Sequence, residues 1–339
     1  MATISDIARR LRLSPSTVSR ALADHPHINE ETKARVRACA VELGYRPNRL
    51  ARGLRAGRTR TLGLVVLDVG DPYYTEIARG AEEVALRHGY MLMLCNADNS
   101  AARGSAYVDL LAEHQVDGVL MTPADRTLSQ AATARVPHVV LIDADSADPA
   151  VSSVSVDHEL GARAAMEHLL ALDHRRIAFV NWTLEAPHCA AAQRGVEATL
   201  VDHGIPLDPA LLRVAERPDA AAAAAVTARL LALPDPPTAV FAYGDLMAYG
   251  AMSAAPVAGL VVPRDLSVVG YDDIPLARHL IPPLTTVRQD TYAIGRRAAE
   301  VLIEEIEGSE TRQHILLQAR LQVRGSTAAP RVTVSAASA

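Results

Sequence analysis

Residues 3–24, TISDIARRLRLSPSTVSRALAD, contain two short amphipathic segments separated by a tight turn at Leu13. Ser5 is the expected N-cap of the first segment, because apolar residues recur after it at helical spacing. Ser14 precedes Pro15, the pattern of an N-cap followed by proline at the first helical position. The stretch therefore predicts two consecutive short helices. The apolar residues on their inner faces are Ile7, Ala8, Leu11, Val18 and Leu22.

The second predicted helix, which runs to about Ala23, has a polar outer face. Its members are Ser16, Thr17, Ser19 and Arg20. Two short helices, the second with a polar face, are the arrangement that insertion into the major groove of DNA requires. Arg20 is the strongest candidate for reading a base, because its guanidinium can form two hydrogen bonds to guanine. The alternative is that Arg20 is simply solvated, as outward-pointing arginines usually are.

A third helix completes the predicted N-terminal domain. Asn29 is its expected N-cap, and Gly44 is expected to end it. Its inner face carries Val36, Ala40 and Leu43. Three helices around one small core predict an all-α helix-turn-helix domain over residues 1–46.

The charge of the chain is divided unevenly. Residues 1–60 hold 13 Lys and Arg against 5 Asp and Glu, a net charge of +8. The rest of the chain holds 21 Lys and Arg against 34 Asp and Glu, a net charge of −13. A basic head on an acidic body places any polyanionic partner at the head.

Residues 47–60 continue the basic head. Pro47 and Asn48 can begin a short helix with Leu50, Ala51 and Leu54 on one side. Such a helix is too short and too self-repelling to be stable alone. It would order against DNA, whose phosphates offset the repulsion. The alternative is an ordinary basic linker.

The 339 residues exceed what one ordinary core holds, and from residue 61 short apolar runs alternate with helical stretches. This alternation predicts parallel α/β sheets covered by helices on both faces, in two similar halves. Residues 220–225, a run of alanines, are expected to be plain helix. The strand candidates are residues 61–69, 90–97, 116–123, 138–144, 153–157, 176–181, 211–215, 238–244 and 266–273.

Polar and aromatic residues gather where the predicted strands end. In parallel sheets a ligand binds beyond the carboxyl ends of the strands. Carboxylates that accept hydroxyl hydrogens, beside aromatic rings, suit a sugar or nucleoside. Asp245 has the alternative role of a helix N-cap, and Tyr271 that of a core residue. The residues at the strand ends are Asp71, Tyr73, Tyr74, Asn96, Asp98, Asp143, Asp145, Asn181, Trp182, Tyr243, Asp245, Asp272 and Asp273.

Several long segments resemble the LacI/GalR family of bacterial repressors. They are TISDIARRLRLSPSTVSRAL, EETKARVRACAVELGYRPNRLARGLRAGRTRTLGLVV, SVVGYDDIPLA, PPLTTVRQ and VRGST, and the likeness extends from residue 2 to about 327. The resemblance implies a helix-turn-helix domain followed by a two-lobed, periplasmic-binding-protein-like sensor domain. It also implies a repressor whose operator affinity is controlled by a small-molecule effector bound between the lobes. The implied segments are a head over 1–46, a hinge over 47–60, a first lobe over 61–160 with 291–318, a second lobe over 161–290 with 319–327, and a disordered tail over 328–339.

By the same resemblance, Pro15, Ser16 and Arg20 hold base-reading positions. Leu54 holds the position of a hinge leucine that wedges into the minor groove and kinks the DNA. This chain has Gly53 where serine or alanine is usual, which costs a helix about 1 kcal/mol. The expected DNA contacts are Thr3, Ser14, Pro15, Ser16, Thr17, Ser19, Arg20, His25, Tyr45, Arg46, Asn48, Arg49, Leu54 and Arg55.

The resemblance also implies effector-binding residues, among which Arg194 and Asp272 match positions that hold the effector. The chain departs from the family at residues 181–183, where a glycine-rich turn is common. It departs again at Glu197 and Ala198, where a glycine and an aromatic residue are usual, so no particular ligand is carried over. The expected effector contacts are Asp71, Tyr73, Tyr74, Asn96, Asp145, Trp182, Arg194, Tyr243, Asp245, Asp272 and Gln289.

Two other protein classes are alternatives: an α/β enzyme acting on a sugar or nucleotide, and a periplasmic sugar-binding protein. The sequence has no GxSxG, HExxH or Walker motif. Asp272 and Asp273 are adjacent, so their side chains diverge and make a poor acid/base pair. His25 and His27 form at most a weak metal pair. We therefore expect no catalytic residue, no metal and no cofactor. A periplasmic protein needs an export signal, whereas MATISDIARR is polar.

The remaining expectations concern assembly and location. A homodimer would place two recognition helices on a near-palindromic double-stranded operator. No leucine-heptad tail follows residue 327, so tetramers through such a tail are not expected. Few cysteines and no run of apolar residues long enough for a membrane span favour the cytoplasm, on the nucleoid, without membrane contact.

Overall fold

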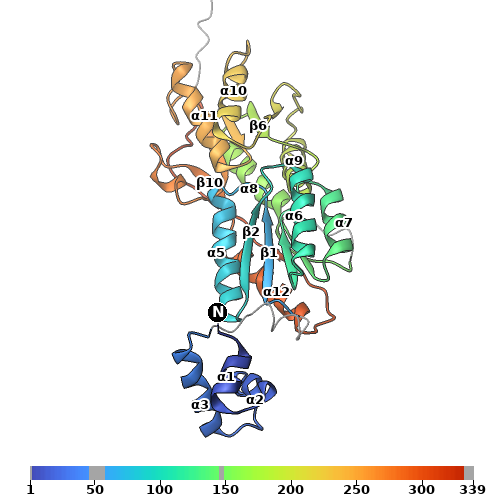
Figure 1. Cartoon of the computed structure of the whole chain (residues 1–339). Helices are drawn as coiled ribbons and strands as arrows, with labels where there is room; N and C mark the ends of the chain where they lie inside the picture. Colours follow the sequence, from blue (N-terminus) through green and yellow to red (C-terminus); the bar gives the residue numbers. More distant parts are fainter. Residues whose placement is uncertain (1, 46–57, 145–148, 332–339) are drawn as a thin grey trace, which may run out of the picture. The chain divides into compact units, whose positions relative to one another are not determined.

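The computed structural model describes residues 2–45, 58–144 and 149–331. Its chain divides into two compact units, Met1–Thr59 and Arg60–Ala339. We call them the head and the sensor, and describe each by itself (Figure 1).

The head is a three-helix domain, as the sequence predicts. Its helices are α1 (Ile4–Leu11), α2 (Pro15–Leu22) and α3 (Glu30–Glu42). They enclose a small apolar core of Ile7, Ala8, Val18, Ala21, Val36, Cys39 and Ala40. The predicted caps of the later helices are confirmed, because Ser14 accepts the Thr17 N–H and Asn29 accepts the Thr32 N–H.

The predicted cap of the first helix is wrong. Ser5 lies inside α1, and Thr3 is the N-cap. The Thr3 hydroxyl accepts the Asp6 N–H at 3.3 Å, while the Asp6 carboxylate accepts the Thr3 N–H at 2.9 Å. An acidic residue three positions after Thr3 completes this reciprocal capping box, whereas Ser5 has only Ala8 at that spacing.

The sensor contains two six-stranded sheets, in the orders β11-β5-β4-β3-β1-β2 and β12-β10-β9-β8-β6-β7. All nine predicted strands are present, each within or close to its expected range. Every pair is parallel except β10 with β12. The first sheet comprises β1 (Thr61–Val66), β2 (Met91–Asn96), β3 (Gly118–Met121), β4 (Val139–Ile142), β5 (Ser152–Val156) and β11 (His314–Leu317). The second comprises β6 (Ile177–Asn181), β7 (Leu212–Val214), β8 (Ala239–Ala242), β9 (Ser267–Asp272), β10 (Thr285–Arg288) and β12 (Arg320–Gln322).

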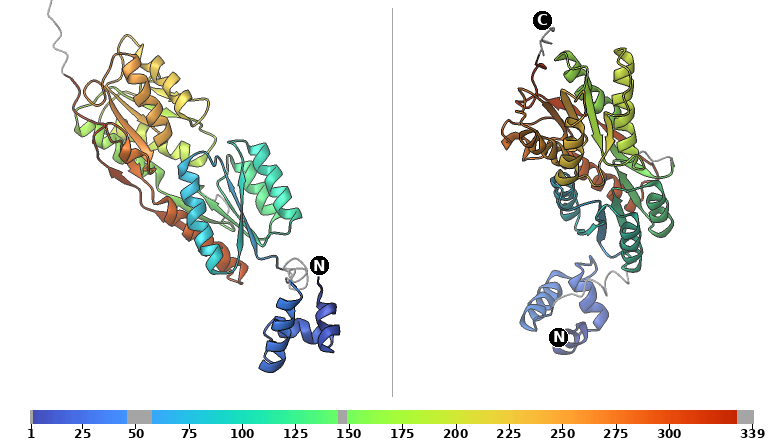
Figure 2. Two further views of the ribbon diagram at one scale, coloured as in Figure 1. Left: turned by 60° about the vertical axis from the view of Figure 1, so that its left-hand side comes forward. Right: turned by 90° about the horizontal axis from the view of Figure 1, so that it is seen from above.

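Helices cover both faces of each sheet, and the two sheets form two lobes (Figure 2). The first lobe has α5 (Pro72–Arg87) and α12 (Thr291–Ile306) on one side, and α6 (Ala101–Glu113) and α7 (Arg126–Arg135) on the other. The second has α8 (His158–Ala171) and α9 (Pro187–Asp202) on one side, and α10 (Ala220–Leu231) and α11 (Asp245–Val257) on the other. The alanine run is therefore helical, as predicted. A short 3₁₀ turn spans Ala277–His279.

The chain crosses from one lobe to the other three times. The crossings join β5 to α8, β10 to α12, and β11 to β12. Helices α5 and α12 pack backbone to backbone. A Cβ on Gly295 would lie 2.0 Å from the Ile77 carbonyl oxygen, and one on Gly80 would lie 2.2 Å from that of Tyr292. This close approach holds the middle of α5 against the first turns of α12. Site residues lie at the start of α5 and just before α12.

Candidate functional site

The outer face of α2 presents hydroxyl groups beside an exposed arginine. Ser14 Oγ lies 2.8 Å from both Ser16 Oγ and Thr17 Oγ1. The Arg20 side chain is exposed and forms no ion pair with any described residue. Four other basic side chains of the head are paired, namely Arg9, Arg10, Lys33 and Arg37, whereas Arg12 and Arg35 are exposed without an ion pair to a described residue. Arg20 is thus available to a partner.

The other expected DNA contacts differ in how they are held. Pro15 is exposed and Ser19 is half-buried. Thr3 forms the cap of α1, and His25 Nδ1 accepts the His27 N–H at 3.3 Å. Tyr45 is half-buried and packs against the apolar core of the head. Five expected contacts lie outside the described residues: Arg46, Asn48, Arg49, Leu54 and Arg55.

A cavity of about 260 Å³ lies in the sensor, where the carboxyl ends of strands from both sheets converge. Each of the strands β1 to β10 contributes lining residues, either from its last residues or from the segment that follows it. Ten separate segments therefore form the cavity. The expected effector contacts that it brings together are Asp71, Tyr73, Tyr74, Trp182, Tyr243, Asp272 and Gln289.

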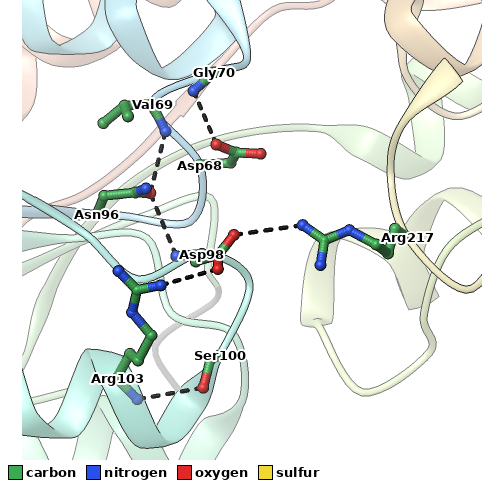
Figure 3. A network of polar contacts seen from close by, with 8 residues as sticks. All are labelled: Asp68, Val69, Gly70, Asn96, Asp98, Ser100, Arg103 and Arg217. Atoms are coloured by element: carbon green, nitrogen blue, oxygen red, sulfur yellow. Dashed lines mark hydrogen bonds and ion pairs between the residues drawn. The ribbon is translucent and has the colours of Figure 1, made fainter.

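Two expected effector contacts instead hold the protein's own backbone. Asn96 accepts the N–H groups of Val69 and Asp98 at 3.2 and 3.3 Å, which shapes the loops after β1 and β2 (Figure 3). Asp245 is buried and accepts the Ile274 N–H at 2.8 Å and the Thr286 hydroxyl. Burial raises the pKa of Asp245 to about 8. Neither residue lines the cavity, and Asp145 lies outside the described residues.

Arg194 is the third expected contact that does not line the cavity. Its side chain is 59% exposed and pairs with Glu159 at 3.3 Å. The buried face of α9 carries Cys189, Ala192 and Val196. Because Arg194 is two residues from Ala192, it lies on nearly the opposite side of the helix. It borders a smaller neighbouring pocket instead.

Two histidines that the sequence analysis did not select line the cavity. His158 begins α8, and a hydrogen bond of 2.9 Å joins its Nδ1 to the Tyr243 hydroxyl. Its Nε2 lies 3.5 Å from Asp143 Oδ1. His188, in the first turn of α9, lies with its ring centroid 6.1 Å from that of Tyr243. The signal for both was their position just after a helix N-cap, where lining residues of α/β sites commonly lie.

The cavity also has carboxyl groups that were not selected as contacts. Asp143 was noted only as a strand-end residue. Asp68, in the loop after β1, bonds the Gly70 N–H at 2.8 Å. Asp219 caps α10. All three line the cavity together with Asp71 and Asp272.

Burial shifts the protonation of several lining groups. Burial, with the nearby charge of Asp68, raises the pKa of Asp71 to about 7. Burial, with the neighbouring carboxyls of Asp71 and Asp245, raises the pKa of Asp272 well above its ordinary value. Burial lowers the pKa of His188 to about 4, so its imidazole is neutral at pH 7.

Several buried polar atoms of the lining have no hydrogen-bond partner within the described protein. They are Tyr73 OH, His188 Nδ1 and Gln289 Oε1, together with Asp143 Oδ1 and His158 Nε2, which lie 3.5 Å from each other and have no other partner. Tyr73, Asp143, His158 and Gln289 are each at most 6% exposed. Unsatisfied buried polar groups are costly, and a cluster of them around a cavity indicates a polar ligand.

The sequence matches two known families. Residues 3–48 match the bacterial regulatory proteins of the lacI family, and residues 166–327 match a periplasmic binding protein-like domain. The chain is 34% identical to the HTH-type transcriptional repressor CytR of Escherichia coli K12, over 97% of each chain. This chain belongs to the LacI/GalR family. The resemblance, the fold class and the function of a ligand-controlled DNA-binding transcription regulator are therefore confirmed.

Solved structures of LacI-family proteins share this architecture. The Lac repressor dimer bound to operator and the anti-inducer ONPF superimposes with a TM-score of 0.86, at 28% identity, over 97% of this chain and 99% of that one. The complex of the regulator CelR with cellobiose gives a TM-score of 0.73 at 30% identity, over 96% of this chain and all of that one.

No described helix is long and apolar enough to cross a membrane. Among the described residues, no three His, Cys, Asp or Glu side chains are grouped to hold a metal ion. The cysteines Cys39, Cys95 and Cys189 are buried free thiols.

Proposed function

We propose that this regulator binds a near-palindromic operator as a homodimer, and that a small ring-bearing effector in the sensor cavity controls its operator affinity. The observation that carries the proposal is the cavity formed by both lobes and lined by unpartnered buried polar atoms. The cellobiose complex of CelR supports a sugar-like ligand, and the aromatic lining suits a sugar or a nucleoside. The Lac repressor dimer on its operator supports the assembly.

The link from effector to operator is a change in the angle between the lobes. A ligand that touches both lobes favours the arrangement in which both sets of contacts are made. The segments that pass between the lobes are the places where this arrangement can alter. Binding then shifts the equilibrium between DNA-competent and incompetent states. The placement of β11 in the first sheet and β12 in the second supports lobes of 61–160 with 291–318 and 161–290 with 319–327.

In the head, we propose that α2 enters the major groove, with Pro15, Ser16 and Arg20 at the base-reading positions and Ser14 contacting a phosphate. The segment 47–55 orders in the minor groove, where Leu54 acts as the wedge. We propose that the regulator acts in the cytoplasm. We propose that it has no catalytic role. Asp272 bonds to Gln289 whereas Asp273 pairs with Arg324, so the adjacent carboxyls do not act as a pair.

Operator binding of the full chain, measured by fluorescence anisotropy over a set of single base-pair changes, tests this proposal. Arg20→Ala should weaken binding by about 1–3 kcal/mol and relax discrimination at one base pair. Leu54→Ala should reduce both operator affinity and DNA bending while effector affinity stays intact. Equal losses for Arg20→Ala on all sequences would make Arg20 a phosphate contact, and unchanged bending would remove Leu54 from the minor groove.

A further inference from the structure

The chain that comes from the head enters the sensor at Arg60. This is the first residue of the sensor unit, directly after the head unit ends at Thr59. Its φ of 54° lies in the left-handed region, which L residues other than asparagine and aspartate rarely adopt. A residue in this conformation turns the chain sharply just before β1. The conformation of Arg60 therefore decides the direction in which the chain toward the head leaves the sensor.

Both backbone groups of Arg60 are bonded to the first lobe. Its N–H donates to Asp117 Oδ2 at 3.0 Å, and its carbonyl oxygen accepts the Met91 N–H at 2.9 Å. Asp117 stands directly before β3 and is 8% exposed. Its own N–H donates to the Thr61 carbonyl oxygen at 2.9 Å, which extends the register of β1 and β3 by one pair. The Asp117 side chain thus ties the residue before β1 to the start of the neighbouring strand.

The Arg60 side chain adds two further contacts. Its Nη1 donates to the His88 carbonyl oxygen at 3.3 Å. Its guanidinium carbon lies 5.0 Å from the centroid of the Tyr90 ring, and Tyr90 is 3% exposed. A cation over the face of a buried aromatic ring is attracted to it electrostatically. The segments before β2 and before β3 together hold this one residue by its backbone and its side chain.

The second lobe shows that a strand of this kind does not need such a side-chain bond. Thr238 stands directly before β8, and its N–H donates to the Arg176 carbonyl oxygen at 2.9 Å, as that of Asp117 does to Thr61. The Thr238 hydroxyl contacts His174 Nδ1 at 2.8 Å and the Arg176 carbonyl oxygen at 3.4 Å, rather than a backbone N–H. The chain enters β6 from its own lobe, whereas it enters β1 from the head. The carboxylate bond is thus found at the strand to which the head is attached.

A fixed exit point limits where the two heads of a dimer can be placed. One base pair added between the half-sites of an operator moves one half-site by about 3.4 Å and rotates it by about 35°. One residue of extended chain spans about 3.3–3.6 Å. Releasing Arg60 from the sensor would therefore give each head enough reach to follow an added base pair, and more freedom of direction.

We propose that Asp117 is a positioning residue, which holds the Arg60 N–H and thereby sets the half-site spacing of the operators that the dimer accepts. The inference rests on the proposed function, in which two heads bind one near-palindromic operator. It adds a determinant of operator specificity outside the head. The acceptor oxygen of Asp117 carries this role, and an amide oxygen also accepts a backbone N–H. Asp117→Asn should accordingly preserve the spacing preference that Asp117→Ala removes.

Binding of the full chain to duplexes with altered spacing tests this role. The duplexes carry the operator that wild type enriches from random DNA, with its half-sites moved apart by one or two base pairs, or with one half-site only. Fluorescence anisotropy measures the affinity for each duplex. Wild type should lose at least tenfold in affinity for the first added base pair, and Asp117→Ala less than threefold, while both bind the single half-site alike. Asp125→Ala is the matched control and should behave as wild type, because Asp125 accepts the Leu128 N–H at 2.8 Å in the same lobe but caps α7.

Arg60→Gly is a second variant that should fold normally, because Arg60 is exposed and glycine adopts the left-handed conformation without strain. It removes both guanidinium contacts and should relax the spacing preference at least twofold. A preference that Asp117→Ala leaves unchanged, or an equal loss of affinity on every duplex, overturns the inference but leaves the proposed dimer intact. An enriched site without a second half-site rejects the proposed binding to a palindrome, and the inference with it.

Discussion

The head and the sensor cavity recognise their ligands in opposite ways. The described candidate contacts of the head come mainly from one helix of eight residues, α2, and each is exposed or half-buried. The lining residues of the cavity come from ten strand ends, and nearly all of them are buried or half-buried. The head offers an unpaired arginine in a basic region, whereas the cavity offers five carboxyls. A polyanion too large to enclose is met by an exposed basic face, and a small polar molecule by an enclosed acidic one.

This contrast predicts that the two regions can be disabled separately. The apolar core of the head is a distinct cluster from those of the sensor lobes. A substitution in one unit should therefore leave the binding of the other unit's ligand close to wild type, apart from the allosteric coupling between them.

The largest effect is expected for Asp272→Ala. Asp272 accepts from Gln289 Nε2 at 2.8 Å, so the variant removes one lining acceptor and frees the amide that it orients. Leaving buried partners unsatisfied costs about 1–3 kcal/mol, which weakens effector binding roughly 5- to 150-fold. Calorimetry with a ligand found by equilibrium dialysis of the full chain against a bacterial metabolite extract, beside operator anisotropy without ligand, measures both regions. Unchanged effector affinity would remove Asp272 from the site, and a matching loss of operator affinity would show that the units are not separable.

The burial of His188 predicts a pH dependence of the stability of the sensor. The pKa of His188 is lowered to about 4, chiefly by burial, so the unfolded chain takes up this proton first as the pH falls. Its stabilising contribution is complete above pH 6.5 and is lost toward pH 4. Between pH 7 and pH 4.5 the free energy of unfolding of wild type should fall by about 2 kcal/mol more than that of His188→Gln, because the variant lacks the buried imidazole. Urea unfolding across this range measures it. His27→Gln, at an exposed position in the head, is the control, and equal curves for both variants would contradict the assigned burial effect.

The sequence predicted the head more fully than the cavity because its signals are local. Ser14 with Pro15, and Asn29 with Thr32, lie within a few residues of each other, so spacing alone identifies these caps. The one wrong cap, Ser5, arose where two hydroxyl residues stand two positions apart. There the choice depended on which of them has an acidic partner three residues later.

The strands and their alternation with helices along the chain were also predictable, because each apolar run is a local signal. The cavity was only partly predictable, since its members meet through the packing of ten strand ends. Strand-end position selected Asp71 and Trp182, which do line the cavity. It also selected Asn96 and Asp245, whose side chains hold loop backbone instead, and hydrogen-bond partners are not visible in a sequence. Arg194 was placed by resemblance, but its helix turns it away from the core.

A smaller effect, confined to the head, is expected for Ser14→Ala. The variant removes the cap that accepts the Thr17 N–H at 3.0 Å, which costs about 1 kcal/mol. Hydrogen exchange of residues 15–22 should become faster, while the exchange of the sensor strands stays unchanged. Ser16→Ala is the matched control, because its exposed hydroxyl contacts only Ser14 Oγ and caps no backbone group. Equal exchange in the two variants would mean that the cap adds nothing to α2.

The smallest effect is expected at the rim of the cavity, where the pair of Arg217 and Asp98 joins the two lobes. Asp98 follows β2 of the first sheet and Arg217 follows β7 of the second, and their side chains are 43% and 55% exposed. Exposed ion pairs contribute about 0–1 kcal/mol and weaken with salt. Arg217→Ala should therefore reduce effector affinity by less than about fivefold, and the difference from wild type should shrink in 0.5 M NaCl. Arg163→Ala removes an ion pair to Asp202 within the second lobe, so it is the control for a pair that spans no gap. A loss above tenfold for Arg217→Ala would mean that the exposed rim, rather than the buried lining, dominates effector binding, and the contrast between an exposed head and an enclosed cavity would then fail.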